Sequence, residues 1–176
     1  CREFFQAGNK LPTLLEQEYR VALDIVEKNM DARFGDPENP LLFSVRSGAP
    51  VSMPGMMNTI LNLGLNDEIA EGLTKKTGNP RFAYDSYRRF IQMFADVVLD
   101  VESAAFEAEL EKYKSEHGKK DDTDMKADDW RAIVDIYKTL VDFPEDPFVQ
   151  LKLAVEAVFL SWHTPRAIVY REMNNI

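Results

Sequence analysis

The chain has 176 residues, of which 45% are hydrophobic and 29% are charged, so its length and composition allow it to bury a core. Its formal net charge of -9 argues against a general attraction to nucleic acid, and no apolar run approaches the ~20 residues that cross a bilayer. The lone cysteine, Cys1, excludes an internal disulfide, and together with two histidines it cannot complete the usual structural zinc site. We therefore expect neither a nucleic-acid nor a membrane partner.

The first residues and the cysteine usage bear on location. Residues 1–5 have neither the basic nor the apolar region of a secretory signal and resemble the middle of a helix, so we expect a segment of a longer chain. A single cysteine agrees with a reducing compartment. We expect a cytoplasmic protein, or one in a plastid or peroxisome-like organelle if the source is eukaryotic.

The first third of the chain mixes helix, strand and loop signals. Residues 14–30 place apolar side chains on one face of a helix. Residues 34–40 form a dense turn signal, and the short apolar run at residues 41–45 predicts a buried strand. Residues 46–64 are too rich in glycine and proline for a helix and too apolar for a disordered linker. Long ordered loops of this kind are usually functional or tightly packed.

From residue 67 onward the sequence predicts helices. Asp67 is expected to cap a first helix that reaches residue 76 and ends at Gly78 and Pro80. A long helix over residues 82–99 carries a wide apolar stripe, which predicts burial on two sides. Further helices are expected over residues 102–117, 128–140, 147–160 and 165–173.

These elements predict an α+β fold that is predominantly α-helical, in three parts. Residues 1–66 would form a partial mixed α/β subdomain, and residues 67–160 would form a helical subdomain. Residues 161–176 would then supply a helix that returns to the first part. The chain shows no internal repeat and no low-complexity segment.

Arg46 is the first candidate for chemistry, because it follows directly on the predicted strand and precedes the small residues Ser47 and Gly48. An arginine at a strand end, beside accessible backbone N–H groups, is well placed to bind phosphate, since its planar group donates two parallel hydrogen bonds. The alternative is an arginine that caps a turn or pairs with a nearby carboxylate.

Three methionines and two arginines are further candidates. Met53, Met56 and Met57 offer an adaptable apolar surface that could line an adenine pocket, although methionines near proline and glycine more often fill a core. Arg88 and Arg89 could dock an anionic partner, although a solvated or salt-bridged helix face is the commoner outcome.

Two other groups of polar residues carry no chemistry. The acidic residues 121–124 lack the glycine and the distal glutamate of a calcium-binding loop, so we expect them to lie at the start of the next helix and to favour its dipole. His117 and His163 have no neighbouring residues that suggest a catalytic triad. The chain also has no Walker-A loop and no Gly-x-Gly-x-x-Gly pattern.

Four blocks of sequence resemble the amino-terminal ATP-binding region of the pyruvate, phosphate dikinase family. They lie at residues 35–49, 52–66, 78–90 and 161–171, in the order and spacing of that family. The Ser-Val-Arg-Ser-Gly core at residues 44–48 is shared with the phosphoenolpyruvate synthases. The Ser-Met-Pro-Gly-Met-Met run at residues 52–57 is more particular to the dikinases.

The resemblance implies part of an ATP-grasp domain with an inserted helical subdomain. It implies an enzyme that moves phosphate from ATP to a histidine on a swivelling domain and then to pyruvate, consuming inorganic phosphate and forming phosphoenolpyruvate, AMP and pyrophosphate. ATP and Mg²⁺ would be the cofactors, and the parent chain would be a homodimer. Arg46, Ser47 and Gly48 would bind ATP and the three methionines would border it, while Arg89 would help to dock the histidine-bearing domain.

The resemblance also implies that other parts lie outside this stretch. A Gly-Lys-Gly segment would precede Cys1, and the magnesium ligands, the second ATP lobe, the phosphorylated histidine and the pyruvate-binding barrel would follow Ile176. We therefore assign no catalytic residue and no metal ligand here, and we expect the isolated chain to be inactive and to bind ATP weakly or not at all.

The sequence departs from the family pattern in four places. Asn58 stands where an aspartate is expected, Lys126 replaces a helix-capping threonine, Glu172 replaces a second basic residue, and the link over residues 138–143 is short. Two alternatives stay open at this point. One is a phosphoenolpyruvate synthase, which uses water in place of phosphate. The other is a non-catalytic helical interaction module.

Overall fold

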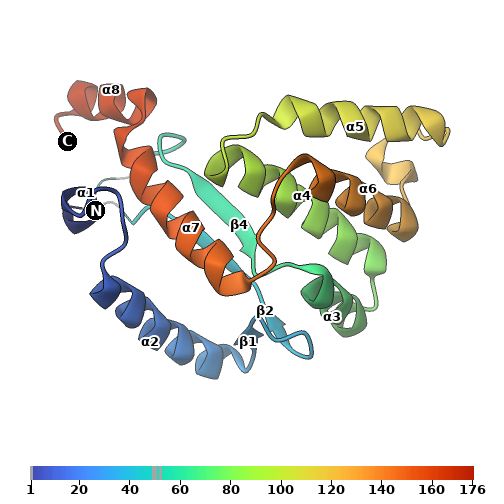
Figure 1. Ribbon diagram of the computed structural model, residues 1–176, viewed down its shortest axis with the longest axis horizontal. Helices are drawn as coiled ribbons and strands as arrows, with labels where there is room; N and C mark the ends of the chain where they lie inside the picture. The colour runs from blue at the N-terminus through green and yellow to red at the C-terminus, as the bar shows by residue number, and fades with distance from the viewer. Residues whose placement is uncertain (1, 49–50, 52) are drawn as a thin grey trace.

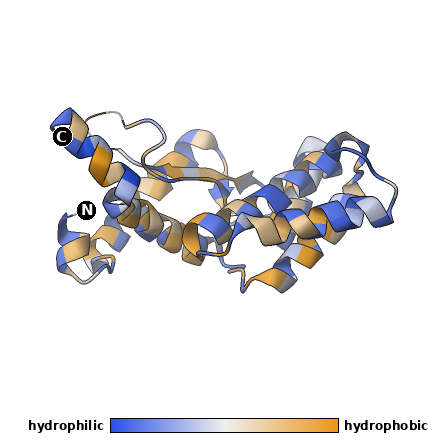
Figure 2. Cartoon of the chain, turned by 90° about the horizontal axis from the view of Figure 1, so that it is seen from above, coloured by the Kyte–Doolittle hydropathy of each residue, from blue (hydrophilic) through white to orange (hydrophobic). Residues whose placement is uncertain are grey.

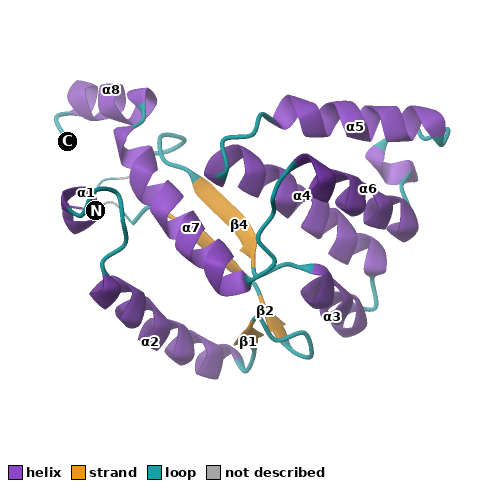
Figure 3. Cartoon of the chain, viewed as in Figure 1, coloured by secondary structure: helices purple, strands orange, loops and turns teal. Residues whose placement is uncertain are grey.

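The computed structural model describes residues 2–48, 51 and 53–176. Two short β-ribbons, one near the centre of the molecule and one at its lower edge in this view, have helices on either side of them (Figure 1, Figure 3). The fold is therefore helix-rich α+β, as predicted. Cys1, the residue on which the expectation about disulfides depends, lies outside the described residues. Within the described residues, no helix has both the length and the apolarity that a membrane crossing needs.

Two helices open the chain. The short helix α1 (Arg2–Gln6) buries Phe4, whose ring centroid lies 5.3 Å from that of Phe159. Helix α2 (Thr13–Met30) confirms the predicted helix, and it ends at Asp31 in the left-handed conformation. Leu23, at 7% exposure, is the buried residue of α2, so most of this helix faces outward.

The strands form two separate pairs. Strand β1 (Arg33–Phe34) pairs in parallel with β2 (Pro40–Leu41), across the predicted turn. Strand β3 (Phe43–Arg46) pairs antiparallel with β4 (Thr59–Leu63), in the register Phe43↔Leu63, Val45↔Ile60 and Arg46↔Thr59.

This pairing corrects two predictions. The single buried strand expected over residues 41–45 is instead two strands that break at Leu42, and the side chains of β3 alternate between half-buried and exposed. The second correction is β4, which lies inside the segment predicted to be an irregular loop. Strand β4 forms because Ile60 and Leu63 are completely buried on one side of the ribbon, a burial that only the folded chain provides.

Helices α3 (Asp67–Thr77) and α4 (Pro80–Val98) follow the ribbon. The residue that caps α3 is Asn66, whose side chain accepts a hydrogen bond from the Ile69 N–H, so the prediction that Asp67 caps this helix was wrong by one position. The amide of Asn66 can bend back to the helix, whereas Asp67 already has helical geometry in the first turn. Asn79 caps α4 in the same way, with Pro80 in its first turn.

The helical core is built around α4. Its buried side chains on two sides include Tyr87, Phe90, Ile91 and Phe94, which confirms the expected burial. Helix α6 (Ala127–Leu140) packs along α4, while α5 (Ser103–Glu116) packs on both. Trp130 and Tyr137 of α6 are fully buried in this contact. In Figure 2 hydrophobic colour is frequent on the helices around the strands, whereas the right-hand end of the molecule, far from both termini, is mostly hydrophilic.

The last helices return to the ribbon. Helix α7 (Pro147–Leu160) packs on β3 and β4 as well as on α4 (Figure 1). A single turn of 3-10 helix (Ser161–His163) then leads into α8 (Pro165–Asn174). The buried side chain of Gln150 joins α7 to the end of β4, because it accepts a hydrogen bond from the Gly64 N–H at 3.0 Å and donates to the Leu65 carbonyl at 2.9 Å. Helix α7 therefore fixes the ribbon from one side.

Candidate functional site

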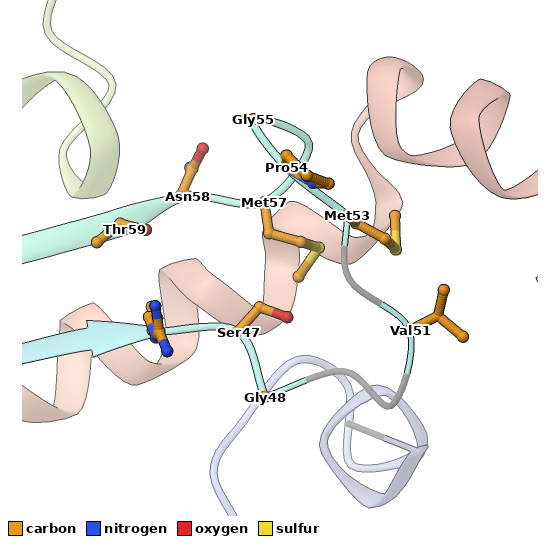
Figure 4. A pocket seen from close by; sticks show the side chains of 10 residues that line it. Ser47, Gly48, Val51, Met53, Pro54, Gly55, Met57, Asn58 and Thr59 are labelled. Carbon is orange, nitrogen blue, oxygen red and sulfur yellow. The ribbon is translucent and has the colours of Figure 1, made fainter.

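A pocket of about 520 Å³ lies at the end of the β3–β4 ribbon. Arg46 ends β3 and pairs in register with Thr59, which begins β4, so the connection between them loops over the end of the ribbon. The described residues that line the pocket come from both strand ends and from this loop (Figure 4). They are Arg46, Ser47, Gly48, Val51, Met53, Pro54, Gly55, Met57, Asn58 and Thr59.

The structure brings five of the six predicted ATP-binding residues to this pocket. Arg46, Ser47, Gly48, Met53 and Met57 line it, and in Figure 4 the side chain of Met57 extends toward Ser47. Ser52, which begins the loop expected to border the nucleotide, lies outside the described residues.

The sixth predicted residue, Met56, does not line the pocket. It is half-buried, and its backbone N–H donates to the Met53 carbonyl at 3.1 Å. Pro54 and Gly55 occupy the two central positions of this tight turn, and Gly55 has a φ of +71°. This is the residue pattern of a type II turn, in which proline presets the first φ and glycine accepts the positive second one. Met53 and Met57, on either side of this turn, line the pocket, whereas Met56 is not among its lining residues.

Arg46 supplies positive charge to the pocket. Its side chain is exposed, and it forms no ion pair with any carboxylate among the residues that the structure describes. No carboxylate is found among the described lining residues either. A guanidinium group in such a setting retains its hydrogen-bond donors for a bound anion, and phosphate oxygens match their geometry.

Arg89 lies elsewhere, on α4, and is not part of the pocket. Its side chain is 60% exposed, and its Nε donates to Asp85 at 3.1 Å. The neighbouring Arg88 is buried and bonds both Asp85 at 2.9 Å and Asp122 at 2.8 Å. Of the two arginines, the structure therefore leaves only Arg89 accessible to a partner.

The acidic residues 121–124 form a separate turn of 3-10 helix (Asp122–Asp124), with Asp121 at its N-cap, and so they do not lie at the start of α6, where the sequence predicted them. Lys114 and Arg88 bond the carboxylate of Asp122, at 2.7 Å and 2.8 Å. Burial opposes the charge on Asp122, but the hydrogen bond from Lys114 and the neighbouring positive charges outweigh it and lower the pKa of this carboxyl group. In the described part of the chain, acidic, histidine and cysteine side chains form no group that could hold a metal ion.

Two residues far along the chain hold the loop, and sequence reasoning missed both. Ser161 Oγ accepts a hydrogen bond from the Asn58 N–H at 3.2 Å. Arg166 Nε donates to the Met56 carbonyl at 3.2 Å, and its Nη2 donates to the Asn58 side-chain oxygen. Both residues lie in the fourth block of the family resemblance, but nothing in their local sequence indicates contact with residues 56–58.

The family described as pyruvate phosphate dikinase, AMP/ATP-binding domain, matches residues 6–176. The chain belongs to this family. Pyruvate, phosphate dikinase from Clostridium symbiosum is 50% identical, in an alignment that covers 100% of this chain and 21% of that protein. The chloroplastic pyruvate, phosphate dikinase 1 of Oryza sativa subsp. japonica is 54% identical, over 100% of this chain and 19% of that protein. Pyruvate, phosphate dikinase 2 of Zea mays is 52% identical, with 100% and 20% covered.

The family comparison confirms the resemblance seen in the sequence. The match covers nearly the whole chain, so the pocket at the ribbon end lies within a stretch that belongs to the AMP/ATP-binding domain family. The chain spans about one fifth of the length of the curated relatives that it matches.

Proposed function

We propose that this chain supplies one wall of the ATP site in a pyruvate, phosphate dikinase. The parent enzyme would transfer phosphate from ATP to a histidine and then to pyruvate, consuming inorganic phosphate and forming phosphoenolpyruvate, AMP and pyrophosphate. The observation that carries the proposal is the exposed guanidinium group of Arg46, which faces a pocket with no carboxylate among its described lining residues, in a domain of this family.

Arg46 would bind the phosphates of ATP. Transfer of a phosphoryl group depends mainly on positioning and on neutralising the negative charge that develops, and a fixed arginine supplies both. Ser47 and Gly48 would add hydrogen-bond donors beside it, while Met53 and Met57 would offer an apolar surface to the base. Met56 would contribute to the shape of the loop through its backbone, which hydrogen-bonds to Met53 and Arg166.

The wider assignments belong to the same proposal. The fold would be part of an ATP-grasp domain divided at residues 66 and 160, with Mg²⁺ held by residues outside this stretch. Arg89 would help to dock the histidine-bearing domain, and the parent would be a homodimer. The location would be the cytoplasm or a plastid, and a plastid fits the relatives of rice and Arabidopsis thaliana, which are named chloroplastic.

The test uses the full-length protein that contains this segment. Label from the β-phosphate of ATP is followed onto the histidine, with and without inorganic phosphate, for wild type and Arg46→Ala. We expect the variant to lose labelling roughly a hundredfold, in line with the loss of one charge-stabilising donor. Arg33→Ala, which removes an exposed arginine outside the pocket, should label like wild type.

Three outcomes would contradict parts of this proposal. Labelling of Arg46→Ala at the wild-type rate would exclude the phosphate-binding role. Turnover of pyruvate to phosphoenolpyruvate without any need for inorganic phosphate would indicate the synthase reaction in place of the dikinase reaction. A wild-type protein that accepts no label would point to a binding module.

A further inference from the structure

Residues 56–58 of the pocket loop are hydrogen-bonded to the corner between α7 and α8, where Ser161 and Arg166 lie. Three hydrogen bonds make this connection. The Asn58 N–H donates to Ser161 Oγ, Arg166 Nε donates to the Met56 carbonyl, and Arg166 Nη2 donates to the Asn58 side-chain oxygen. The partners are separated by 103 to 110 positions in the sequence, so only the folded chain brings them together.

The Ser161 end of this connection is rigid. Ser161 is 1% exposed, and its hydroxyl donates to the Val158 carbonyl of α7 at 2.7 Å while its oxygen accepts from Asn58. The same oxygen lies 3.8 Å from the sulfur of Met57, which lines the pocket. Helix α7 packs on both strands of the ribbon, so Ser161 ties the loop to the element that already fixes the strand ends.

The Arg166 end has a different character. Helix α8 has one buried residue, Ala167, and carries two arginines, Arg166 and Arg171. Arg171 contacts Trp162, at the start of the same corner, and not residues 56–58 of the pocket loop. Arg171 donates to the Trp162 carbonyl and its guanidinium carbon lies 4.1 Å from the centroid of the Trp162 ring. Arg166 is the arginine of α8 that reaches across to the pocket loop, with two donors on two different residues of it.

We propose that Arg166, supported by Ser161, is a positioning residue for the nucleotide pocket. It would act on the nucleotide only through the segment of Met56, Met57 and Asn58, of which the last two line the pocket. This inference rests on the proposed function of the pocket. If loss of Arg166 leaves the binding-competent loop in about one tenth of the molecules, the apparent affinity for ATP falls by the same factor.

The first experiment measures KM for ATP in histidine labelling by the full-length protein. Arg166→Ala should raise KM about tenfold, the factor that ~1.4 kcal/mol corresponds to, with a smaller change in kcat. Arg171→Ala is the matched control, since it removes an arginine of the same helix that does not contact the loop, and its KM should stay at the wild-type value. Exchange of label between pyruvate and phosphoenolpyruvate, which needs no ATP, should be unchanged in both variants and so shows that the transfer between histidine and pyruvate is intact.

A double-mutant cycle then tests whether Arg166 acts on the pocket through the side chain of Asn58. If Arg166 acts through Asn58, the effect of Arg166→Ala on KM should be much less than tenfold when Asn58 is already alanine. A full tenfold effect in the Asn58→Ala background would exclude the Asn58 side chain and assign the effect to the bond with the Met56 carbonyl. A wild-type KM in Arg166→Ala itself would overturn the proposal. An equal rise in KM for Arg171→Ala would also overturn it, because general loosening of α8 would then suffice.

Hydrogen exchange supplies a readout that is independent of activity. The amides of residues 56–58 should exchange faster in Arg166→Ala and in Ser161→Ala than in wild type, and at the wild-type rate in Arg171→Ala. Unchanged exchange in the first two variants would contradict the proposal. Arg46→Ala separates the two claims: if it abolishes labelling while Arg166→Ala changes neither KM nor exchange, the pocket assignment stands and the positioning role fails.

Discussion

The guanidinium group of Arg88 lies over the indole ring of Trp130, with its central carbon 4.4 Å from the ring centroid. Arg88 is 6% exposed, and the nitrogens of its guanidinium group bond the carboxylates of Asp85 and Asp122. The two carboxylates balance its charge, while the flat face of the guanidinium group packs on the indole ring. This contact joins α4 to α6 at the centre of the helical part. Arg89, one position later, points outward.

We expect Arg88→Met to lower the free energy of unfolding by about 2–4 kcal/mol. The substitution removes one partner from a buried ion pair and leaves Asp85 and Asp122 with fewer donors, which costs more than the apolar side chain regains. Arg89→Ala is the matched control and should change stability by about 0–1 kcal/mol, because its ion pair is exposed. Urea unfolding followed by circular dichroism checks both, and equal effects at the two positions would contradict the distinction.

Asp122 should make stability depend on pH in the acid range. Its pKa is lower in the folded chain than the value of about 3.9 that an unfolded aspartate has, so its contribution is fully present above that value. The contribution declines as the pH falls through the folded-state pKa, because protonation removes the attraction of Lys114 and Arg88. Asp122→Asn should therefore destabilise the chain at pH 6 and much less at pH 3.

The control variant for Asp122→Asn is Asp96→Asn. Asp96 is an exposed carboxylate on α4 that forms no ion pair with the described residues. Its effect on the urea midpoint should be small at both pH values. A destabilisation by Asp122→Asn that is as large at pH 3 as at pH 6 would show that packing, and not charge, accounts for the role of Asp122.

Gly72 should not tolerate even alanine. A Cβ at this position of α3 would lie 1.8 Å from the carbonyl oxygen of Pro37, and that oxygen belongs to the backbone of the turn between β1 and β2. Glycine to alanine within a helix normally stabilises by ~1 kcal/mol, but here we expect a loss of about 2 kcal/mol or more, because the turn must shift. Lys75→Ala on the exposed face of α3 should change stability by less than about 0.5 kcal/mol. A Gly72→Ala chain as stable as wild type would show that the turn moves freely.

Gln150 should be essential for stability although it lies outside the pocket. It is completely buried, and its amide satisfies the Gly64 N–H and the carbonyls of Leu65 and Pro144. Gln150→Leu keeps the bulk but leaves these three backbone groups without partners, for which we expect a loss of about 3 kcal/mol. Val149→Ala, at the exposed neighbouring position, should change stability by less than about 1 kcal/mol. If the leucine variant unfolds at the wild-type urea concentration, the amide is not what joins α7 to β4.

The helices could be predicted from the sequence because the signals for them are local, although their first residues were not all predicted correctly. The apolar stripe of α4 repeats within one helix, and Gly78 ends α3 in the left-handed conformation as predicted, whereas the caps of α3 and α4 are Asn66 and Asn79. The Ser-Val-Arg-Ser-Gly run likewise indicated a phosphate-binding candidate at a strand end, and Arg46 does end a strand. In each case the residues that carry the signal are near neighbours in the chain.

Only the tertiary structure decided where these residues meet. Strand β4 was missed because its apolar side chains become buried by pairing with β3 and by packing against α7, neither of which is written in its own five residues. That pairing places Arg46 beside Thr59 and makes the pocket. Ser161 and Arg166 reach Asn58 across more than 100 positions, and such contacts depend on how whole elements pack, which no local pattern of residues encodes.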